Sequence, residues 1–224
     1  MDIILLRHGQ SEANIKLTEH LDSPLTLLGQ EQARLTGGRL SGEGITKIYV
    51  SPLRRALQTV APFCALSGQQ AEVYADVCEY FNEKWPGYQT FPGLTPDDIR
   101  AQFPFAFFGN TFPCSAAWWP SPLENDARMY ARAERVRDAL LSLYADTDET
   151  LLVVSHAETV GRLTEVFLRV PAPGPEQSWE KPPWSDNCAL TRLHVPTDAA
   201  QPAQLLFQND TAQLAELMAA NASG

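Results

Sequence analysis

Two histidines in this chain each follow directly on a short apolar run. Residues 3–6 lead into Arg7 and His8, and the apolar part of LLVVSHAET leads into His156. The chain contains only four histidines. A neutral imidazole can act as a nucleophile, and an arginine beside it can hold an anionic group through paired hydrogen bonds. One histidine after a strand is usually a structural residue, but two in matched positions favour a site for an anion.

A second feature of the same kind is a pair of arginines in SPLRRALQT, residues 51–59. Ser51 and Pro52 are typical of the start of a helix, which places Arg54 and Arg55 in its first turn. Cations there oppose the helix dipole unless they share an anion with the backbone amides. Because consecutive helical side chains point about 100° apart, we expect only one of the two arginines to face such a site.

The elements that must position these residues alternate between strand-like and helix-like patterns. Short apolar runs predict strands at 3–6, 45–50, 71–77 and 151–155, and later strands at 189–195 and 204–207. Helical spacing predicts helices at 28–40, 51–66, 123–144 and 158–169. Such alternation indicates an α/β fold, a three-layer α/β/α sandwich with a mostly parallel central sheet. Ligands of these sheets bind outside the carboxyl ends of the strands, where His8 and His156 are expected to meet.

The composition limits the classes of protein to which the chain can belong. Its 224 residues fit a single domain, and 44% hydrophobic residues supply a core. With 17 basic and 27 acidic residues, the net charge of −10 disfavours nucleic acid and anionic membranes as partners. The four cysteines form no C-x-x-C motif, and no apolar run is long enough for a signal peptide or a transmembrane helix. These features predict a cytoplasmic protein.

Five segments, in this order, resemble the histidine phosphatase superfamily in its phosphoglycerate mutase-like branch. They are RHGQSEAN, DSPLTLLGQEQA, SPLRRALQT, the glutamate of VCEYF, and VVSHAET. The resemblance covers residues 1–79 and 150–169, and WSDNCALTRL matches a late family segment more weakly. It implies the phosphoglycerate mutase-like fold and catalysis through a phosphohistidine.

The resemblance also implies which residues do the chemistry. His8 would be the nucleophile that attacks phosphorus. Glu79 would protonate the leaving alkoxide and then activate water, a task that burial assists by keeping the carboxyl protonated. Glu83 lies four residues further on and stays an alternative for the same role.

Other matching positions would bind the phosphoryl group. Arg7, Arg55 and His156 would hold its oxygens and stabilise the negative charge of the transition state. The motif position selects Arg55 rather than the arginine before it. Asn14 and the backbone amide of Ala157, which replaces the glycine of many members, would add hydrogen bonds. Neither a cofactor nor a metal is implied, because the arginines already carry the positive charge.

Residues 80–122 match no part of the family pattern, and they hold 12 of the 21 aromatic residues of the chain. An insertion between the third strand and the long helix would form a cap over the pocket of one domain spanning residues 1–224. The alternative is a small separate core or the contact of a homodimer. Only Lys84 and Arg100 are basic in this segment, which favours a small phosphomonoester with an apolar or aromatic alcohol.

Three functions are therefore compared. A phosphatase comes first. A phosphoglycerate mutase comes second, because it needs more positive charge around its highly anionic substrate. A phosphate-binding or regulatory module with little turnover comes third. A site that has lost its activity usually lacks a catalytic residue, and here all five expected catalytic positions are filled.

Other phosphate-handling motifs are absent or misplaced. DTDET, residues 146–150, resembles the motif of aspartyl-phosphate phosphatases, but it precedes a strand instead of following one. There is no G-x-x-x-x-G-K-[ST] loop, and no cysteine is followed by arginine six residues later. The two other histidines and three arginines of the long helix are predicted to be surface residues. They are His20, His194, Arg128, Arg132 and Arg135.

Overall fold

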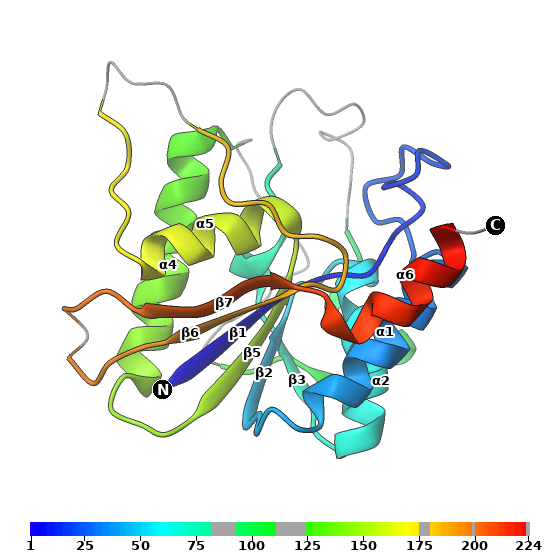
Figure 1. The fold of residues 1–224 in the computed structure, drawn as a ribbon, viewed down its shortest axis with the longest axis horizontal. Helices are drawn as coiled ribbons and strands as arrows, with labels where there is room; N and C mark the ends of the chain where they lie inside the picture. Colours follow the sequence, from blue (N-terminus) through cyan, green and yellow to red (C-terminus); the bar gives the residue numbers. More distant parts are fainter. Residues whose placement is uncertain (82–92, 111–123, 175–179, 199, 223–224) are drawn as a thin grey trace.

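The computed structural model of the chain describes residues 1–81, 93–110, 124–174, 180–198 and 200–222. In this part of the chain one sheet lies between two layers of helices (Figure 1). The three-layer α/β/α sandwich predicted from the sequence is confirmed.

Seven strands among the described residues form the sheet, in the order β4-β3-β2-β5-β1-β6-β7. Neighbours from β4 to β1 pair in parallel, whereas β6 and β7 add antiparallel strands at the other edge. The strands are β1 (Asp2–Arg7), β2 (Lys47–Val50), β3 (Ala71–Val73), β4 (Ala106–Phe107), β5 (Thr150–Ser155), β6 (Leu190–His194) and β7 (Gln204–Asp210).

The helices cover the two faces of the sheet. On one face lie α1 (Leu27–Leu40), α2 (Arg54–Ser67) and α3 (Pro96–Gln102), and on the other lie α4 (Asp126–Tyr144) and α5 (Ala157–Phe167). Near the C-terminus, η3 (Ala212–Leu214) contacts α1 and leads into α6 (Ala215–Ala222). Side-chain caps define two of the starts: Thr26 accepts from the Gly29 amide before α1, and Asn125 accepts from the Arg128 amide before α4.

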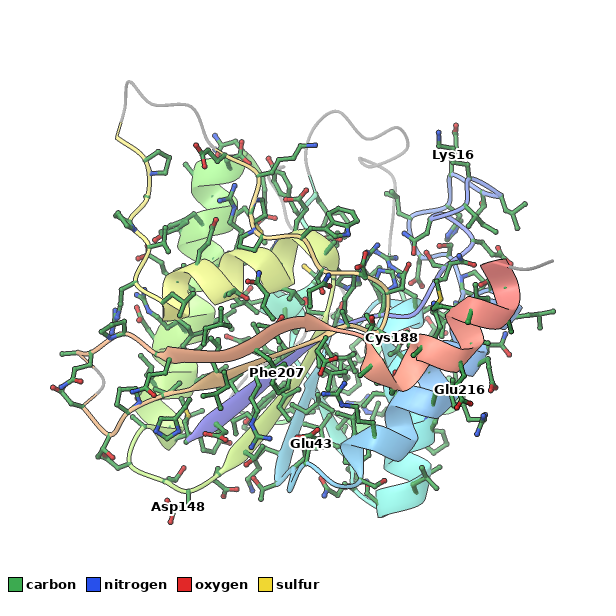
Figure 2. All side chains as sticks on the ribbon, viewed as in Figure 1. Lys16, Glu43, Asp148, Cys188, Phe207 and Glu216 are labelled. Carbon is green, nitrogen blue, oxygen red and sulfur yellow. The ribbon has the colours of Figure 1, made fainter. Side chains whose placement is uncertain are left out.

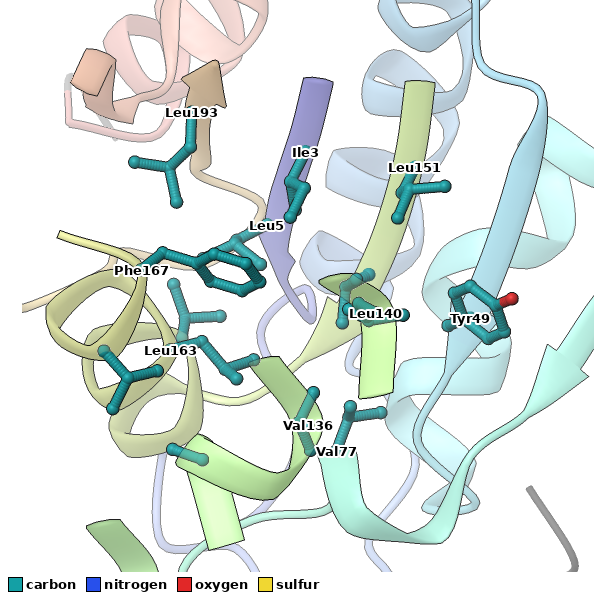
Figure 3. Packing of buried hydrophobic residues seen from close by; sticks show 14 of the residues in the cluster. Ile3, Leu5, Tyr49, Val77, Val136, Leu140, Leu151, Leu163, Phe167 and Leu193 are labelled. Carbon is teal, nitrogen blue, oxygen red and sulfur yellow. The ribbon is translucent and has the colours of Figure 1, made fainter. Parts of the chain in front are cut away.

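β1 shows how the sequence divides the core between the two faces. Ile3 and Leu5 point into the cluster beneath α4 and α5, which Figure 3 shows in detail. Ile4 and Leu6 point into the cluster beneath α1 and α2. All four side chains are fully buried. A continuous apolar run is what a strand covered on both faces requires.

Four predicted boundaries need correction. α4 begins at Asp126 rather than at residue 123, and β7 extends to Asp210 rather than to residue 207. The third strand ends at Val73 instead of residue 77, because the chain turns there into η1 (Ala75–Val77). The second helix begins at Arg54 rather than at Ser51. The Ser51 hydroxyl does not cap that helix as expected; it accepts from the amide of Leu53 at 3.3 Å and is hydrogen-bonded to His156 at 2.7 Å.

The described part of residues 80–122 joins the main body. Its α3 and β4 extend the fold at the edge beside β3, and Ile99 and Phe103 belong to the core beneath α1 and α2. Residues 82–92 and 111–123 lie outside the described residues, so a cap formed by them stays a prediction. Glu83 lies in the first of these gaps.

The prediction that Arg132 lies on a solvated face of the long helix is wrong. Its side chain is 3% exposed and forms an ion pair with buried Glu124. Arg135, on the same helix, is 61% exposed as expected. The difference arises because the segment that follows β3 covers one turn of α4, a contact between residues distant in sequence.

Candidate active site

The register of two parallel strands brings the histidines together. Arg7 at the end of β1 lies opposite Ser155 at the end of β5, so His8 and His156 leave the sheet side by side. Their ring centroids are 5.0 Å apart, with the rings tilted by 58°. Both side chains are almost fully buried. The sheet thus places two imidazoles at one point, as the sequence pattern predicts.

Hydrogen bonds at both ring nitrogens define the protonation of His8. Nδ1 lies 2.6 Å from the carbonyl oxygen of Gly9, which can only accept a hydrogen bond. Nε2 accepts from Nε of Arg55 at 3.1 Å, and an arginine nitrogen can only donate. Burial, and then the charges of Arg55 and Arg7, lower the pKa of His8 well below its usual value. The ring is therefore neutral, with its lone pair on Nε2.

Arg55 is held between the nucleophilic nitrogen and the loop that follows β1. Besides its bond to His8, it donates from Nη1 to the carbonyl oxygen of Leu21 at 2.7 Å. Its neighbour Arg54 points elsewhere and donates to the side chain of Gln102 at 3.0 Å. One arginine of the pair faces the site, which is the geometry expected for consecutive helical residues.

Arg7 is anchored by the segment before β6. It donates to the carbonyl oxygen of Ser185 at 2.6 Å, and its guanidinium lies 5.0 Å from the ring centroid of Trp184. In the same segment, Asn187 donates to the backbone oxygen of His8 at 3.0 Å and to Oδ1 of Asn14 at 3.2 Å. The WSDNC segment thus contacts both the side chain of Arg7 and the backbone of His8.

Several buried polar atoms around His8 have no hydrogen-bond partner among the described residues. They are Nε of Arg7, Nδ1 of His156 and Oγ of Ser11. A buried donor without a partner costs about 1–3 kcal/mol. Because all three belong to residues that can donate to an oxyanion, the arrangement suits an anion such as phosphate.

Glu79 faces the same space from the segment after η1. Its side chain is 7% exposed, and its Oε1 accepts from the amide of Tyr80 at 2.9 Å. Burial raises the pKa of this carboxyl, and the Tyr80 amide and Arg55 oppose that rise only in part. A carboxyl with a raised pKa can act as a proton donor near neutral pH.

A pocket of about 470 Å³ opens in front of these groups. Its wall includes Glu79 and the loop between β1 and α1, on which Figure 2 shows Lys16. Neither His156 nor Ala157 lines the pocket; both are buried at the start of α5. The lining residues are Arg7, His8, Ser11, Ala13, Asn14, Lys16, Thr18, Glu19, His20, Leu21, Arg55 and Glu79.

The family model for the histidine phosphatase superfamily (branch 1) matches residues 3–208. The chain belongs to the histidine phosphatase superfamily.

Individual relatives of this histidine phosphatase carry different names. A protein of Photorhabdus laumondii called a probable phosphoglycerate mutase GpmB is 39% identical, with 86% of this chain and 84% of the relative covered. A glucosyl-3-phosphoglycerate phosphatase of Mycolicibacterium vanbaalenii is 27% identical, with 75% of each chain covered. The crystal structure of the ecdysone phosphate phosphatase of Bombix mori in complex with tungstate has a TM-score of 0.69. It is 17% identical, with 93% of this chain and 92% of the other covered, and supports the fold alone.

The structure of this superfamily member brings most of the sequence-predicted site residues together. Arg7, His8, Asn14, Arg55 and Glu79 line one pocket, and His156 packs against His8. Asn14 is exposed, and its Oδ1 also accepts from the amide of Ser11 at 3.0 Å.

Sequence reasoning missed three contributors to this site. His20 is exposed as predicted, but its place in the pocket wall was not foreseen. Ser51 binds the imidazole of His156, and Trp184 packs on Arg7. The weak match of the WSDNC segment to the family was the signal for Trp184, whereas nothing in the local sequence distinguished His20.

No group of three or more histidine, cysteine or acidic side chains in the described ranges is arranged to hold a metal ion. None of the helices in the same part of the chain is long and apolar enough to cross a bilayer.

Proposed function

We propose that this protein is a metal-independent phosphomonoester hydrolase that works through a phosphohistidine on His8. The observation that carries the proposal is the state of His8 itself. Its ring is neutral, its lone pair is on Nε2, and that nitrogen faces the guanidinium of Arg55 in a pocket that Glu79 also lines.

The reaction has two displacements. In the first, Nε2 of His8 forms a bond to phosphorus while the bond from phosphorus to the alcohol oxygen breaks, and Glu79 gives its proton to that oxygen. In the second, Glu79 takes a proton from water as the water oxygen attacks phosphorus, and the bond to Nε2 breaks to release inorganic phosphate. Arg7, Arg55 and His156 hold the phosphoryl oxygens throughout.

The remaining binding groups belong to the same proposal. Asn14 adds a side-chain hydrogen bond, and the amide of Ala157 contributes the positive end of the α5 dipole. The cations of Arg7 and Arg55 supply the charge that a metal would otherwise provide. The substrate is a small phosphomonoester with an apolar or aromatic part. Beyond the arginines that bind the phosphoryl group, the pocket wall carries one lysine, Lys16, and segment 80–122 has only two basic residues against three acidic ones.

We also place the protein in the cytoplasm, where its thiols stay reduced. Cys64, Cys78 and Cys188 are buried free cysteines, which suits a compartment that does not form disulfides. A homodimer stays a prediction that the aromatic residues of segment 80–122 motivate.

Phosphoglycerate mutase is the second candidate. The relative from Photorhabdus laumondii, at 39% identity, bears that name. A mutase must pass its phosphoryl group to a second phosphoglycerate faster than to water. The two candidates therefore differ in the fate of one shared phosphohistidine.

The test is hydrolysis of 4-nitrophenyl phosphate in excess chelator, with native protein, His8→Ala and His194→Ala. His194 is 47% exposed and bonds to Asp2 away from the pocket, so its variant is the matched control. We expect turnover and an acid-labile phosphoenzyme in the native protein and the control, and neither in His8→Ala. Transfer between phosphoglycerates without hydrolysis would support the mutase instead. Phosphate binding without hydrolysis or transfer would support the third function, a phosphate-binding module.

A further inference from the structure

The strongest unexplained feature is a buried ion pair behind Glu79. Arg132 comes from α4, and Glu124 lies two residues before that helix begins. The guanidinium donates from Nε and Nη2 to the two oxygens of Glu124, each at 2.7 Å. Both side chains are almost fully buried. The pocket in front of His8 includes neither of them.

The rest of the same guanidinium binds the backbone of the Glu79 segment. Nη1 donates to the carbonyl oxygens of Asp76 at 2.6 Å and Cys78 at 2.9 Å, and Nη2 donates to that of Glu79 at 3.2 Å. A guanidinium has five N–H groups. Two bonds to Glu124 and three to backbone carbonyls match these five groups in number, and Nη2 also lies 2.8 Å from the sulfur of Met129.

Neighbouring elements add hydrogen bonds to carbonyls of the same segment, including that of Cys78. Ser155 at the end of β5 donates to the Val77 oxygen at 2.7 Å, and Thr159 of α5 donates to the Cys78 oxygen at 2.6 Å. The amide of Glu124 donates to the Phe81 oxygen at 2.9 Å. The backbone on both sides of Glu79 is therefore fixed from α4, β5 and α5.

Stability alone does not account for this arrangement. Burying two charges is costly, and an apolar pair of similar volume in the same place is often as stable or more so. A planar fork that donates to three carbonyls of one segment, however, fixes position in a way that apolar packing does not.

We infer that Arg132 and Glu124 are positioning residues that hold the Glu79 carboxyl within reach of the leaving-group oxygen. The inference rests on the proposed function, in which Glu79 donates the proton. Proton transfer needs hydrogen-bond distance, and a displacement of about 1 Å in an active site can cost about 100-fold in rate.

The test is a series of substituted phenyl phosphates whose phenols differ in pKa, hydrolysed by native protein, Glu79→Gln, Arg132→Lys and Arg137→Lys. Lysine keeps the charge opposite Glu124 but lacks the fork. For Arg132→Lys, kcat/KM on esters of phenols with a high pKa is expected to fall about 10- to 100-fold. This loss is part of what a positioned acid contributes. For esters of phenols with a low pKa, kcat/KM should fall less than about 3-fold, because the leaving phenolate oxygen needs little protonation. The dependence of log kcat/KM on phenol pKa becomes steeper, as it does for Glu79→Gln.

Arg137→Lys is the matched control. Arg137 is also a buried arginine of α4, but it donates to Asp138 and to the Val166 oxygen of α5 instead of the Glu79 segment. We expect its slope to equal that of native protein. Because a slope does not depend on the folded fraction, it separates positioning from partial unfolding. If Arg132→Lys does not fold, the slope is read from the double variant Arg132→Met, Glu124→Leu, which leaves no buried charge unpaired.

The outcomes are distinct. An equal loss on every ester in Arg132→Lys, with an unchanged slope, would overturn the positioning role while leaving the proposed function intact. A native slope in Glu79→Gln would overturn the acid role of Glu79 and the positioning role with it. Absence of any phosphoenzyme in native protein would overturn the proposed function itself.

Discussion

At the scale of single residues, burial moves the pKa values of the two central groups in opposite directions. It raises the pKa of the Glu79 carboxyl, so that its protonated form persists toward neutral pH. It lowers the pKa of His8 well below the usual value, so that the neutral imidazole persists into acid. Each group is therefore held in the form that the first displacement requires.

This pairing predicts the pH profile with an alkyl phosphate, whose leaving group needs protonation. kcat/KM falls on the alkaline side as Glu79 loses its proton, and on the acid side as His8 gains one. In Glu79→Gln, rates drop about 100-fold or more and the alkaline limb of Glu79 disappears. Steady-state rates between pH 4 and 10, a range of about six units around the usual pKa values, provide the measurement. An unchanged alkaline limb in the variant would assign that limb to another group.

The pairing of His8 with His156 could be predicted because each follows a strongly patterned strand, whereas the choice of Arg55 over its neighbour came from the resemblance to the family. It did not predict the burial of Arg132. Helical spacing places Arg128, Arg132 and Arg135 on related faces, but only the path of residues 76–81 decides which of them is covered. Contacts of that kind depend on the tertiary fold and leave no local signal.

At the scale of elements, the start of α1 packs directly on the backbone after β1. A Cβ atom built on Gly29 would lie 2.0 Å from the carbonyl oxygen of Gln10, and one on Gly9 would lie 2.7 Å from that of Gly29. These are backbone atoms, so neither clash is relieved by rotating a side chain. The contact ties the helix to the residues that immediately follow His8.

Gly29→Ala is therefore expected to lower the free energy of unfolding by about 1–3 kcal/mol and to reduce kcat/KM by displacing the His8 loop. Gly38→Ala in the same helix is the control. Nothing lies within 4 Å of a Cβ there, and alanine should raise stability by about 0.5–1 kcal/mol. Urea denaturation and phosphatase rates measure both effects. Equal stability changes in the two variants would contradict the proposed contact.

The order of elements could be predicted because apolar runs and helical patterns alternate strongly. The edge strand β4 could not, since Ala106–Phe107 is too short to carry a periodic signal. The early end of β3 was also hidden, because the turn at residues 75–77 is favoured by hydrogen bonds from α4 rather than by local glycine or proline.

At the scale of the whole molecule, the sheet separates two apolar clusters. Val136 of α4 belongs to one and Val60 of α2 to the other, and both are fully buried. Each Val→Ala change removes two carbon atoms and should cost about 2 kcal/mol, at about 0.8 kcal/mol per carbon plus the cavity left behind. Because the sites share no partners, the double variant should show the sum within about 0.5 kcal/mol. Denaturant titration checks this, and a large deviation would mean that the two faces are coupled through the sheet.

The reactivity of the buried thiols reports on local unfolding of this molecule. Burial raises the pKa values of Cys64, Cys78 and Cys188 to about 12, so each reacts with a thiol reagent only when its surroundings transiently separate. The carbonyl of Cys78 is held beside Glu79, and the amide of Cys188 donates to the backbone oxygens of Arg7 and His8, whereas Cys64 lies near the far end of α2. Vanadate bound at His8 should therefore slow alkylation of Cys78 and Cys188 more than that of Cys64, as peptide-resolved mass spectrometry would reveal. Uniform slowing would instead mean that the core opens only as one cooperative unit.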